Sequence, residues 1–92
     1  MSYEIPTPSK IQGSLLRYIA EEILLDPTRV VHAEEPLITS GLIDSFHLVD
    51  LALYVEDSFR VRIEDTELAA SVFDTVSELT TLIVGRIPDK SP

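Results

Sequence analysis

The chain of 92 residues contains no cysteine. This absence excludes disulfide bonds, thiolate metal sites and cysteine nucleophiles, so any thiol chemistry has to come from a group attached to the protein. The two histidines, His32 and His47, are too few and too far apart in the sequence to predict a zinc site. The sequence therefore predicts neither a disulfide scaffold nor a protein-bound zinc ion.

Long apolar runs are also missing, although apolar residues make up 45% of the chain. No run approaches the roughly 18 residues that a membrane span requires. The N-terminal stretch MSYEIPTPSK has neither the charged start nor the apolar core of a signal peptide. A chain of this length forms one hydrophobic core and is too small for a cleft between domains. We expect a single cytoplasmic domain.

Basic residues are scarce: seven lysines and arginines stand against sixteen acidic residues, giving a net charge of −9. Such a charge repels nucleic acid and anionic membranes and attracts basic protein surfaces. Acidity of this kind also serves solubility alone. We therefore expect no nucleic-acid partner, and the charge indicates a protein partner only where it gathers beside a site.

The spacing of the apolar residues predicts helices. Near the N-terminus, four isoleucines and leucines recur at intervals of four and predict a first helix over about residues 9–25. These residues are Ile11, Leu15, Ile19 and Ile23. Ser9 and Gln12 have the spacing of a capping box, and Asp26-Pro27 ends the helix.

A long connection, residues 27–43, separates the first helix from the second. It is rich in apolar residues, so we expect it to pack on the core rather than to lie free. These residues are Val30, Val31, Leu37, Ile38, Leu42 and Ile43. Gly41 suits a turn with a positive φ. Asp44 is placed to cap a second helix, which should run from Ser45 to about Phe59.

The C-terminal third adds one short helix and one longer helix. FRVRIED alternates like a strand, but no partner strand is predicted elsewhere, so we interpret it as a connection. Residues 65–71 predict the short helix, and residues 75–87 predict the longer one, with Thr75 and Glu78 as a capping box. Five residues of the last helix should face inward. They are Val76, Leu79, Leu82, Ile83 and Ile87.

The predicted fold class is all-α. We expect a small bundle of three main helices and one short helix, with a long connection between the first two. The folded domain should comprise residues 9–87, with a tail of residues 1–8 before it and a fraying tail of residues 88–92 after it.

The second helix has two apolar faces. One arc of roughly 100° should form the core face. It contains Leu48, Leu51, Ala52, Val55 and Phe59. The nearly opposite stripe contains Phe46, Val49 and Leu53, flanked by the acidic residues Asp50, Glu56 and Asp57. This stripe is either covered by the long connection or exposed for a basic partner with an apolar groove.

Ser45 stands at the first position of this helix. Its hydroxyl is not needed for capping, because Asp44 caps. No Gly-x-Ser-x-Gly elbow is present, and His47 projects roughly 200° around the helix from the serine, so a serine nucleophile with its base is poorly supported. A phosphodiester on Ser45 would instead lie at the positive end of the helix dipole, although Asp44 opposes it by like charge.

Several segments resemble acyl and peptidyl carrier proteins. GLIDSF resembles the Gly-x-Asp-Ser-Leu signature around the modified serine of that family, and FDTVSELTTLI resembles the start of its last helix. LVDLALYVEDSFRVRI is similar to the family's acidic second helix, and the likeness runs from about Ile11 to Ile87. The resemblance implies a non-catalytic carrier with the fold of that family.

The resemblance also implies the site and its partners. Ser45 would bear a 4′-phosphopantetheine arm derived from coenzyme A, with Asp44 as the adjacent family acid, and cargo would be carried as a thioester. Partner docking would fall on the apolar stripe and its acidic rim: Phe46, Val49, Asp50, Leu53, Glu56 and Asp57. The partners would be a phosphopantetheinyl transferase, an acyl- or amino-acyl-loading ligase and downstream acyl-transferring enzymes, and we expect a monomer.

Two residues depart from the family pattern: Phe46 replaces the usual leucine, and His47 replaces an acid common in fatty-acid carriers. SVFDTVSELTTL is more similar to amino-acyl or peptidyl carriers. Two other functions stay open at this point. One is an unmodified acidic adaptor that binds a basic partner through the second helix, and the other is a small serine hydrolase.

Overall fold

The computed structural model of the chain describes residues 6–87. Its elements are α1 (Pro8–Tyr18), a π-helical turn (Ile19–Ile23), α2 (Ser45–Phe59), a 3-10 turn (Asp65–Glu67) and α3 (Val76–Arg86). The described part of the chain contains helices and no strand, so the prediction of an all-α fold is confirmed. In the FRVRIED segment, Phe59 ends α2 and Asp65 begins the 3-10 turn, and residues 60–64 between them form an irregular connection, as expected.

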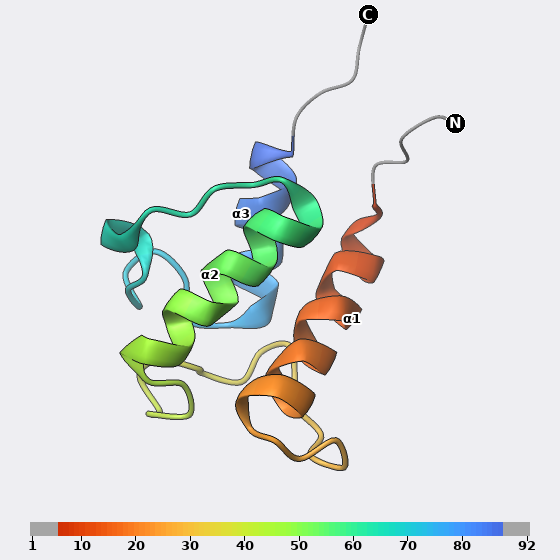
Figure 1. The fold of residues 1–92 in the computed structure, drawn as a ribbon, viewed down its shortest axis with the longest axis vertical. Coiled ribbons are helices and arrows are strands. Elements are labelled where there is room, and N and C mark those ends of the chain that lie inside the picture. The colour runs from red at the N-terminus through yellow and green to blue at the C-terminus, as the bar shows by residue number, and fades with distance from the viewer. Residues whose placement is uncertain (1–5, 88–92) are drawn as a thin grey trace, which may run out of the picture.

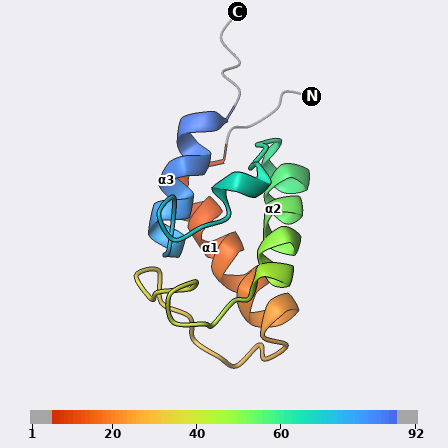
Figure 2. The same cartoon turned by 90° about the vertical axis from the view of Figure 1, so that its left-hand side faces the viewer.

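The three α-helices enclose one core. α1 runs downward in Figure 1, whereas α2 and α3 run upward beside it. Viewed from the side, α3 and α2 flank α1, and the segment of residues 60–75 crosses between α2 and α3 on the side opposite α1 (Figure 2). The connection of residues 24–44 passes beneath the lower end of the bundle in both views, and it leads directly into α2.

α1 buries the predicted stripe, but its N-terminus differs from the prediction. Ile11, Leu15 and Ile19 are fully buried. The cap is Thr7, whose hydroxyl accepts a hydrogen bond from the Lys10 amide at 3.2 Å, and Pro8 occupies a first-turn position. The predicted capping box of Ser9 and Gln12 is therefore wrong. Proline suits this position because the first helical amides have no partner within the helix.

The end of the first helix is a π turn rather than α-helix. The Leu24 amide donates to the Ile19 carbonyl, and the Asp26 amide donates to the Ala20 carbonyl, both at 2.8 Å. The wider turn keeps Ile19, Ala20 and Ile23 buried together. The chain leaves the helix through Leu25, which adopts a positive φ of 55°, an unfavourable conformation for leucine.

The long connection packs on the core, with one exception. Val31, Leu37 and Ile43 are buried, and Ile38 and Leu42 pack partly against the core. The exception is Val30, which we expected to pack inward but which is 68% exposed. It follows the Asp26–Arg29 turn at the lower end of the bundle, where only one of two successive valines can face the core. Gly41 has the expected positive φ, 79°.

Asp74, two residues before α3, holds this connection in place through hydrogen bonds. Its carboxylate accepts hydrogen bonds from the Ile38 amide at 2.7 Å and the Thr39 amide at 3.0 Å, and from the Thr39 hydroxyl at 2.5 Å. The Asp74 carbonyl accepts a further bond from the Leu37 amide at 2.6 Å. The Thr39 hydroxyl, followed by the backbone amides, lowers the pKa of Asp74 below its ordinary value.

The short helix predicted over residues 65–71 is only the 3-10 turn Asp65–Glu67. Ile63 and Phe73, on either side of this segment, are both buried. Their burial draws the chain across the gap between α2 and α3, so tertiary packing overrides the local helix propensity. Between residues 6 and 87 the chain thus forms three α-helices, with a 3-10 turn in place of the predicted fourth helix.

α3 begins as predicted, with a modified cap. The Thr75 hydroxyl accepts from the Glu78 amide at 3.0 Å, but the Glu78 carboxylate bonds the Asp74 amide at 2.7 Å instead of the Thr75 amide. Val76, Leu79 and Ile83 are buried as expected. Leu82 and Ile87 are only partly buried at the edge of the core.

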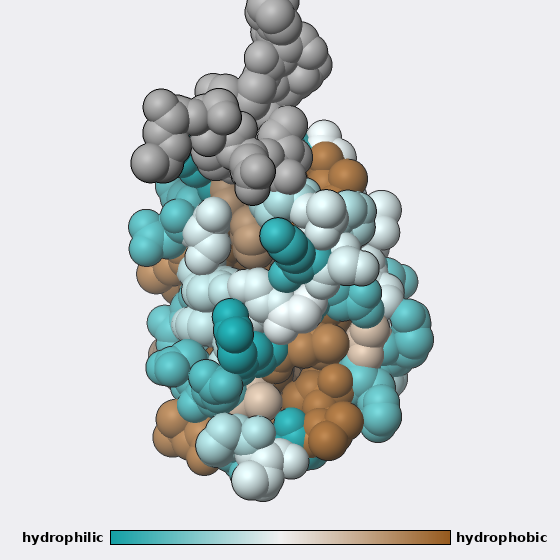
Figure 3. All heavy atoms as spheres, turned by 90° about the vertical axis from the view of Figure 1, so that its right-hand side faces the viewer, coloured by the Kyte–Doolittle hydropathy of each residue, from teal (hydrophilic) through white to brown (hydrophobic). Residues whose placement is uncertain are grey.

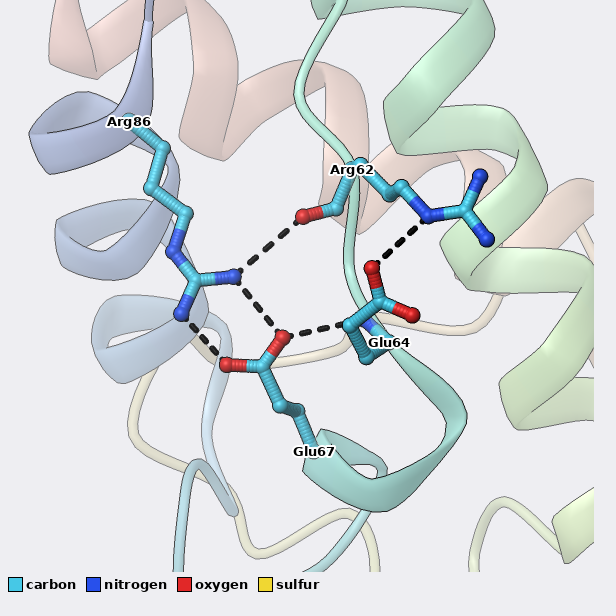
Figure 4. Close-up of polar contacts among 4 residues, drawn as sticks. All are labelled: Arg62, Glu64, Glu67 and Arg86. Carbon is cyan, nitrogen blue, oxygen red and sulfur yellow. Dashed lines mark hydrogen bonds and ion pairs between the residues drawn. The ribbon is translucent and has the colours of Figure 1, made fainter.

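An ion-paired network fastens the 60–75 segment to the end of α3 (Figure 4). The Arg86 guanidinium donates to both carboxylate oxygens of Glu67 and, at 3.2 Å, to the Arg62 carbonyl. Glu67 also accepts from the Glu64 amide at 2.9 Å, and Arg62 pairs with the Glu64 carboxylate at 2.8 Å. Arg86, followed by the Glu64 amide, lowers the pKa of Glu67 to about 2.

This network predicts a pH dependence. Because the folded pKa of Glu67 is lowered, its contribution to stability is fully present above its ordinary pKa of 4.5 and is lost as the pH falls towards about 2. Arg86→Gln should raise the pKa of Glu67 towards 4.5. NMR titration of the Glu67 side chain measures this shift. A Glu67 carboxyl that titrates near 4.5 in the unchanged protein would contradict the network.

The core assignment predicts that Val55→Ala destabilises the protein by about 1–4 kcal/mol, because Val55 is fully buried and its truncation leaves a cavity. Leu53→Ala on the same helix is the matched control. Leu53 is 58% exposed, so its loss should change the free energy of unfolding by no more than about 0.5 kcal/mol. Urea denaturation measures both. Equal losses would mean that the two faces of α2 are wrongly assigned.

Candidate functional site

α2 presents one face to the core and the other to solvent. All five predicted core residues, Leu48, Leu51, Ala52, Val55 and Phe59, are buried. The opposite stripe is exposed: Phe46 at 81%, Val49 at 44% and Leu53 at 58%. The alternative that the connection covers this stripe is therefore wrong. Asp50, Glu56 and Asp57 are also exposed and complete the predicted acidic rim.

Asp44 organises the N-terminus of α2. It has an extended backbone, and its carboxylate accepts the His47 amide at 2.9 Å, as predicted for an N-cap. The same oxygen lies 2.8 Å from His47 Nδ1, so the imidazole is hydrogen-bonded to the cap. The His47 amide, with a smaller contribution from the imidazole, lowers the pKa of Asp44. His47 is thus half-exposed and hydrogen-bonded to Asp44.

Ser45 follows the cap and is exposed. Within residues 6–87 its hydroxyl makes no hydrogen bond, so the capping role belongs entirely to Asp44. His47 is hydrogen-bonded to Asp44 and, within residues 6–87, makes no hydrogen bond to Ser45 as a general base would. This arrangement does not fit a serine hydrolase. It leaves an accessible hydroxyl at the positive end of the α2 dipole, which favours an attached anion, although Asp44 already accepts the His47 amide there.

The structure also shows a feature that the sequence analysis missed. A shallow open hollow lies beside α2 and is lined by Tyr18, Asp50, Leu53, Tyr54, Glu56 and Asp57. The rings of Tyr18 and Tyr54 stack across α1 and α2 with their centroids 4.1 Å apart. No local pattern could have paired these tyrosines, because they are far apart in the chain and meet only when the helices pack.

Comparison with known proteins decides the family. The chain is 32% identical to Acyl carrier protein 3 of Ralstonia nicotianae over 75 residues, which cover 82% of this chain and 84% of that protein. The chain belongs to the acyl carrier protein family. No protein-family model matches this carrier protein.

The fold of the carrier protein agrees with this membership. A crystal structure of an acyl carrier protein from Thermotoga maritima superposes with a TM-score of 0.65 at 26% identity, covering 86% of this chain and 88% of that chain. As a member of this family, the protein is a carrier and not a catalyst. In the part of the chain that the structure describes, no helix is long and apolar enough to cross a membrane.

The roles of Asp44 and Ser45 in the carrier protein can be separated by stability. Ser45→Ala should leave the free energy of unfolding within about 0.5 kcal/mol, because an exposed hydroxyl without a partner is removed. Asp44→Ala should lower it clearly, because the cap and the His47 contact are both lost. Urea denaturation of both variants tests this. A larger loss of unfolding free energy in Ser45→Ala than in Asp44→Ala would show that the serine is structural.

Proposed function

We propose that this carrier protein bears a 4′-phosphopantetheine on Ser45 and presents acyl or amino-acyl thioesters to separate enzymes in the cytoplasm. The pathways concerned are of the fatty-acid, polyketide or nonribosomal-peptide type. The observation that carries the proposal is the exposed Ser45 hydroxyl, which has no hydrogen-bond partner within residues 6–87 and stands at the first position of α2. A group attached there extends into solvent without disturbing the core.

The residues at this site fit a phosphate-linked group. Ser45 Oγ would hold it, and the positive end of the α2 dipole would favour its negative charge. Asp44 opposes that charge, but its carboxylate is already engaged by the His47 amide and imidazole. When bound, the group supplies the thiol that this cysteine-free chain lacks and that holds cargo as a thioester.

Attachment is a group transfer catalysed by a separate transferase. Ser45 Oγ forms a bond to the phosphorus that bears the pantetheine arm of coenzyme A. The diphosphate bond breaks, adenosine 3′,5′-bisphosphate leaves, and the serine proton passes to a base of the transferase. Ser45 contributes only the hydroxyl, which agrees with the absence of a base bonded to it within residues 6–87.

The exposed face of α2 is the proposed partner surface. Phe46, Val49 and Leu53 supply exposed apolar area next to the serine. Asp50, Glu56 and Asp57 surround this area with negative charge, which favours basic partners: the transferase, the loading ligase and the acyl-transferring enzymes. The SVFDTVSELTTL segment favours amino-acyl or peptidyl cargo over fatty-acyl cargo, whereas Phe46 in place of leucine bears on which partners bind.

The modification is tested by incubating the full chain with coenzyme A and a broad-specificity phosphopantetheinyl transferase. We expect a mass gain of about 340 Da that Ser45→Ala abolishes. Ser58→Ala, which removes another exposed serine of α2, is the matched control and should load normally. No mass gain would favour the unmodified adaptor, and a gain retained by Ser45→Ala would place the group on another residue.

A further inference from the structure

Hydrogen bonds to Asp74 fix three successive residues of the connection to the start of α3. The Asp74 carboxylate accepts the Ile38 and Thr39 amides at 2.7 and 3.0 Å and the Thr39 hydroxyl at 2.5 Å. The Leu37 amide donates to the Asp74 carbonyl at 2.6 Å. Asp74 is half-buried, so these bonds are partly shielded from water.

A further hydrogen bond carries this anchor to the attachment site. The Ile43 amide donates to the Leu37 carbonyl at 3.0 Å, which closes a loop whose first residues are held by Asp74. Ile43 is buried, and the next residue is Asp44, the cap of α2. Ser45 therefore lies two residues beyond the closed end of a loop that Asp74 fixes to α3.

Apolar packing fixes the connection less firmly than it fixes the helices. Leu25 and Val30, in its first half, are 76% and 68% exposed. Figure 3 views the molecule from the α1 side, and in its lower half, where the connection passes, brown apolar surface lies open between teal and white polar side chains. Segments with few buried apolar contacts open locally at a low cost in free energy, so hydrogen bonds supply much of the restraint on this connection.

We propose that Asp74 is a positioning residue for the attachment of 4′-phosphopantetheine: it holds the loop that leads into α2 and so presents the Ser45 hydroxyl to the transferase in one orientation. Asp74 takes no part in the group transfer itself. The transferase has to bring the serine oxygen to the phosphorus within a narrow range of distance and direction. When the loop is released, only a fraction of the molecules present Ser45 correctly, and the apparent affinity for the transferase falls by that fraction. The inference rests on the proposed function.

The central test measures the kinetics of the transferase, with coenzyme A in excess and the full chain as the varied substrate. Asp74→Ala should raise KM about tenfold and leave kcat nearly unchanged, because the transferase selects the molecules with a correctly placed serine. Asp74→Asn keeps an oxygen that accepts the same amides through weaker, neutral hydrogen bonds. Its KM should lie between those of Asp74→Ala and the unchanged protein. An unchanged KM in Asp74→Ala would overturn the inference.

Thr75→Ala is the matched control, because it weakens the start of α3 without touching the connection. The Thr75 hydroxyl accepts the Glu78 amide at 3.0 Å, and within residues 6–87 it makes no hydrogen bond to the connection. Loss of this cap should lower the free energy of unfolding but leave KM nearly unchanged. Urea denaturation checks that every variant is folded in the assay. An equal rise of KM in Thr75→Ala and Asp74→Ala would overturn the positioning role.

A double variant shows whether Asp74 acts through the connection. Thr39→Val has nearly the same shape and removes the hydroxyl that donates to Asp74. It should raise KM by a smaller factor, and it decides the question if Asp74→Ala fails to fold. Combined with Asp74→Ala it should raise KM no further, because the two side chains form one contact. A multiplied rise would mean that Asp74 contacts the transferase directly, which contradicts the positioning role.

Hydrogen exchange gives a measurement that does not involve the transferase. In Asp74→Ala the Ile43 amide should exchange faster, whereas the Leu79 amide, bonded within α3 to the Thr75 carbonyl, should not. Equal acceleration of both amides would indicate general loosening and would contradict the inference. Failure of the unchanged protein to load would overturn the proposed function and this inference with it. Normal loading together with an unchanged KM in Asp74→Ala would overturn this inference alone.

Discussion

The hydrogen bonds of Asp74 hold the irregular part of this fold in place. One carboxylate and its own carbonyl accept the amides of Leu37, Ile38 and Thr39, joining the long connection to the start of α3. Leu37 and Ile43 pack into the core on either side of this contact. Since Asp44, the N-cap of α2, directly follows Ile43, the contact sets where Asp44 and Ser45 lie.

Helix α2 shows why the main elements could be predicted from the sequence. Asp44 and the positive φ of Gly41 fix its start, and the period of Leu48, Leu51 and Val55 fixes its buried face, so its bounds agree with the structure. The Thr7 cap had a local signal that was missed, because proline directly follows the capping threonine. The π turn and the 3-10 turn could not be predicted, since they depend on how these segments pack against the other helices, which local propensity does not encode.

The candidate site likewise contains features that could be predicted from the sequence and features that could not. Ser45, its cap and the exposed stripe lie within one helix, where spacing gives relative orientation, so sequence reasoning could place them. The Asp74 contact, the Arg86–Glu67 pair and the Tyr18–Tyr54 stack each join residues distant in the chain. Without the packing of α1 against α2, no pattern distinguishes Tyr18 from an ordinary half-buried helix residue.

Helix α2 completes the core with one face and exposes the opposite face, which is the proposed partner surface. The central claim is that the outward serine at its start is the attachment point. Peptide mapping by mass spectrometry of the protein purified from its own host tests this most directly. The account predicts a phosphopantetheine, free or with its cargo, on the peptide containing Ser45. An unmodified Ser45 peptide beside a phosphopantetheine on any other residue would contradict it.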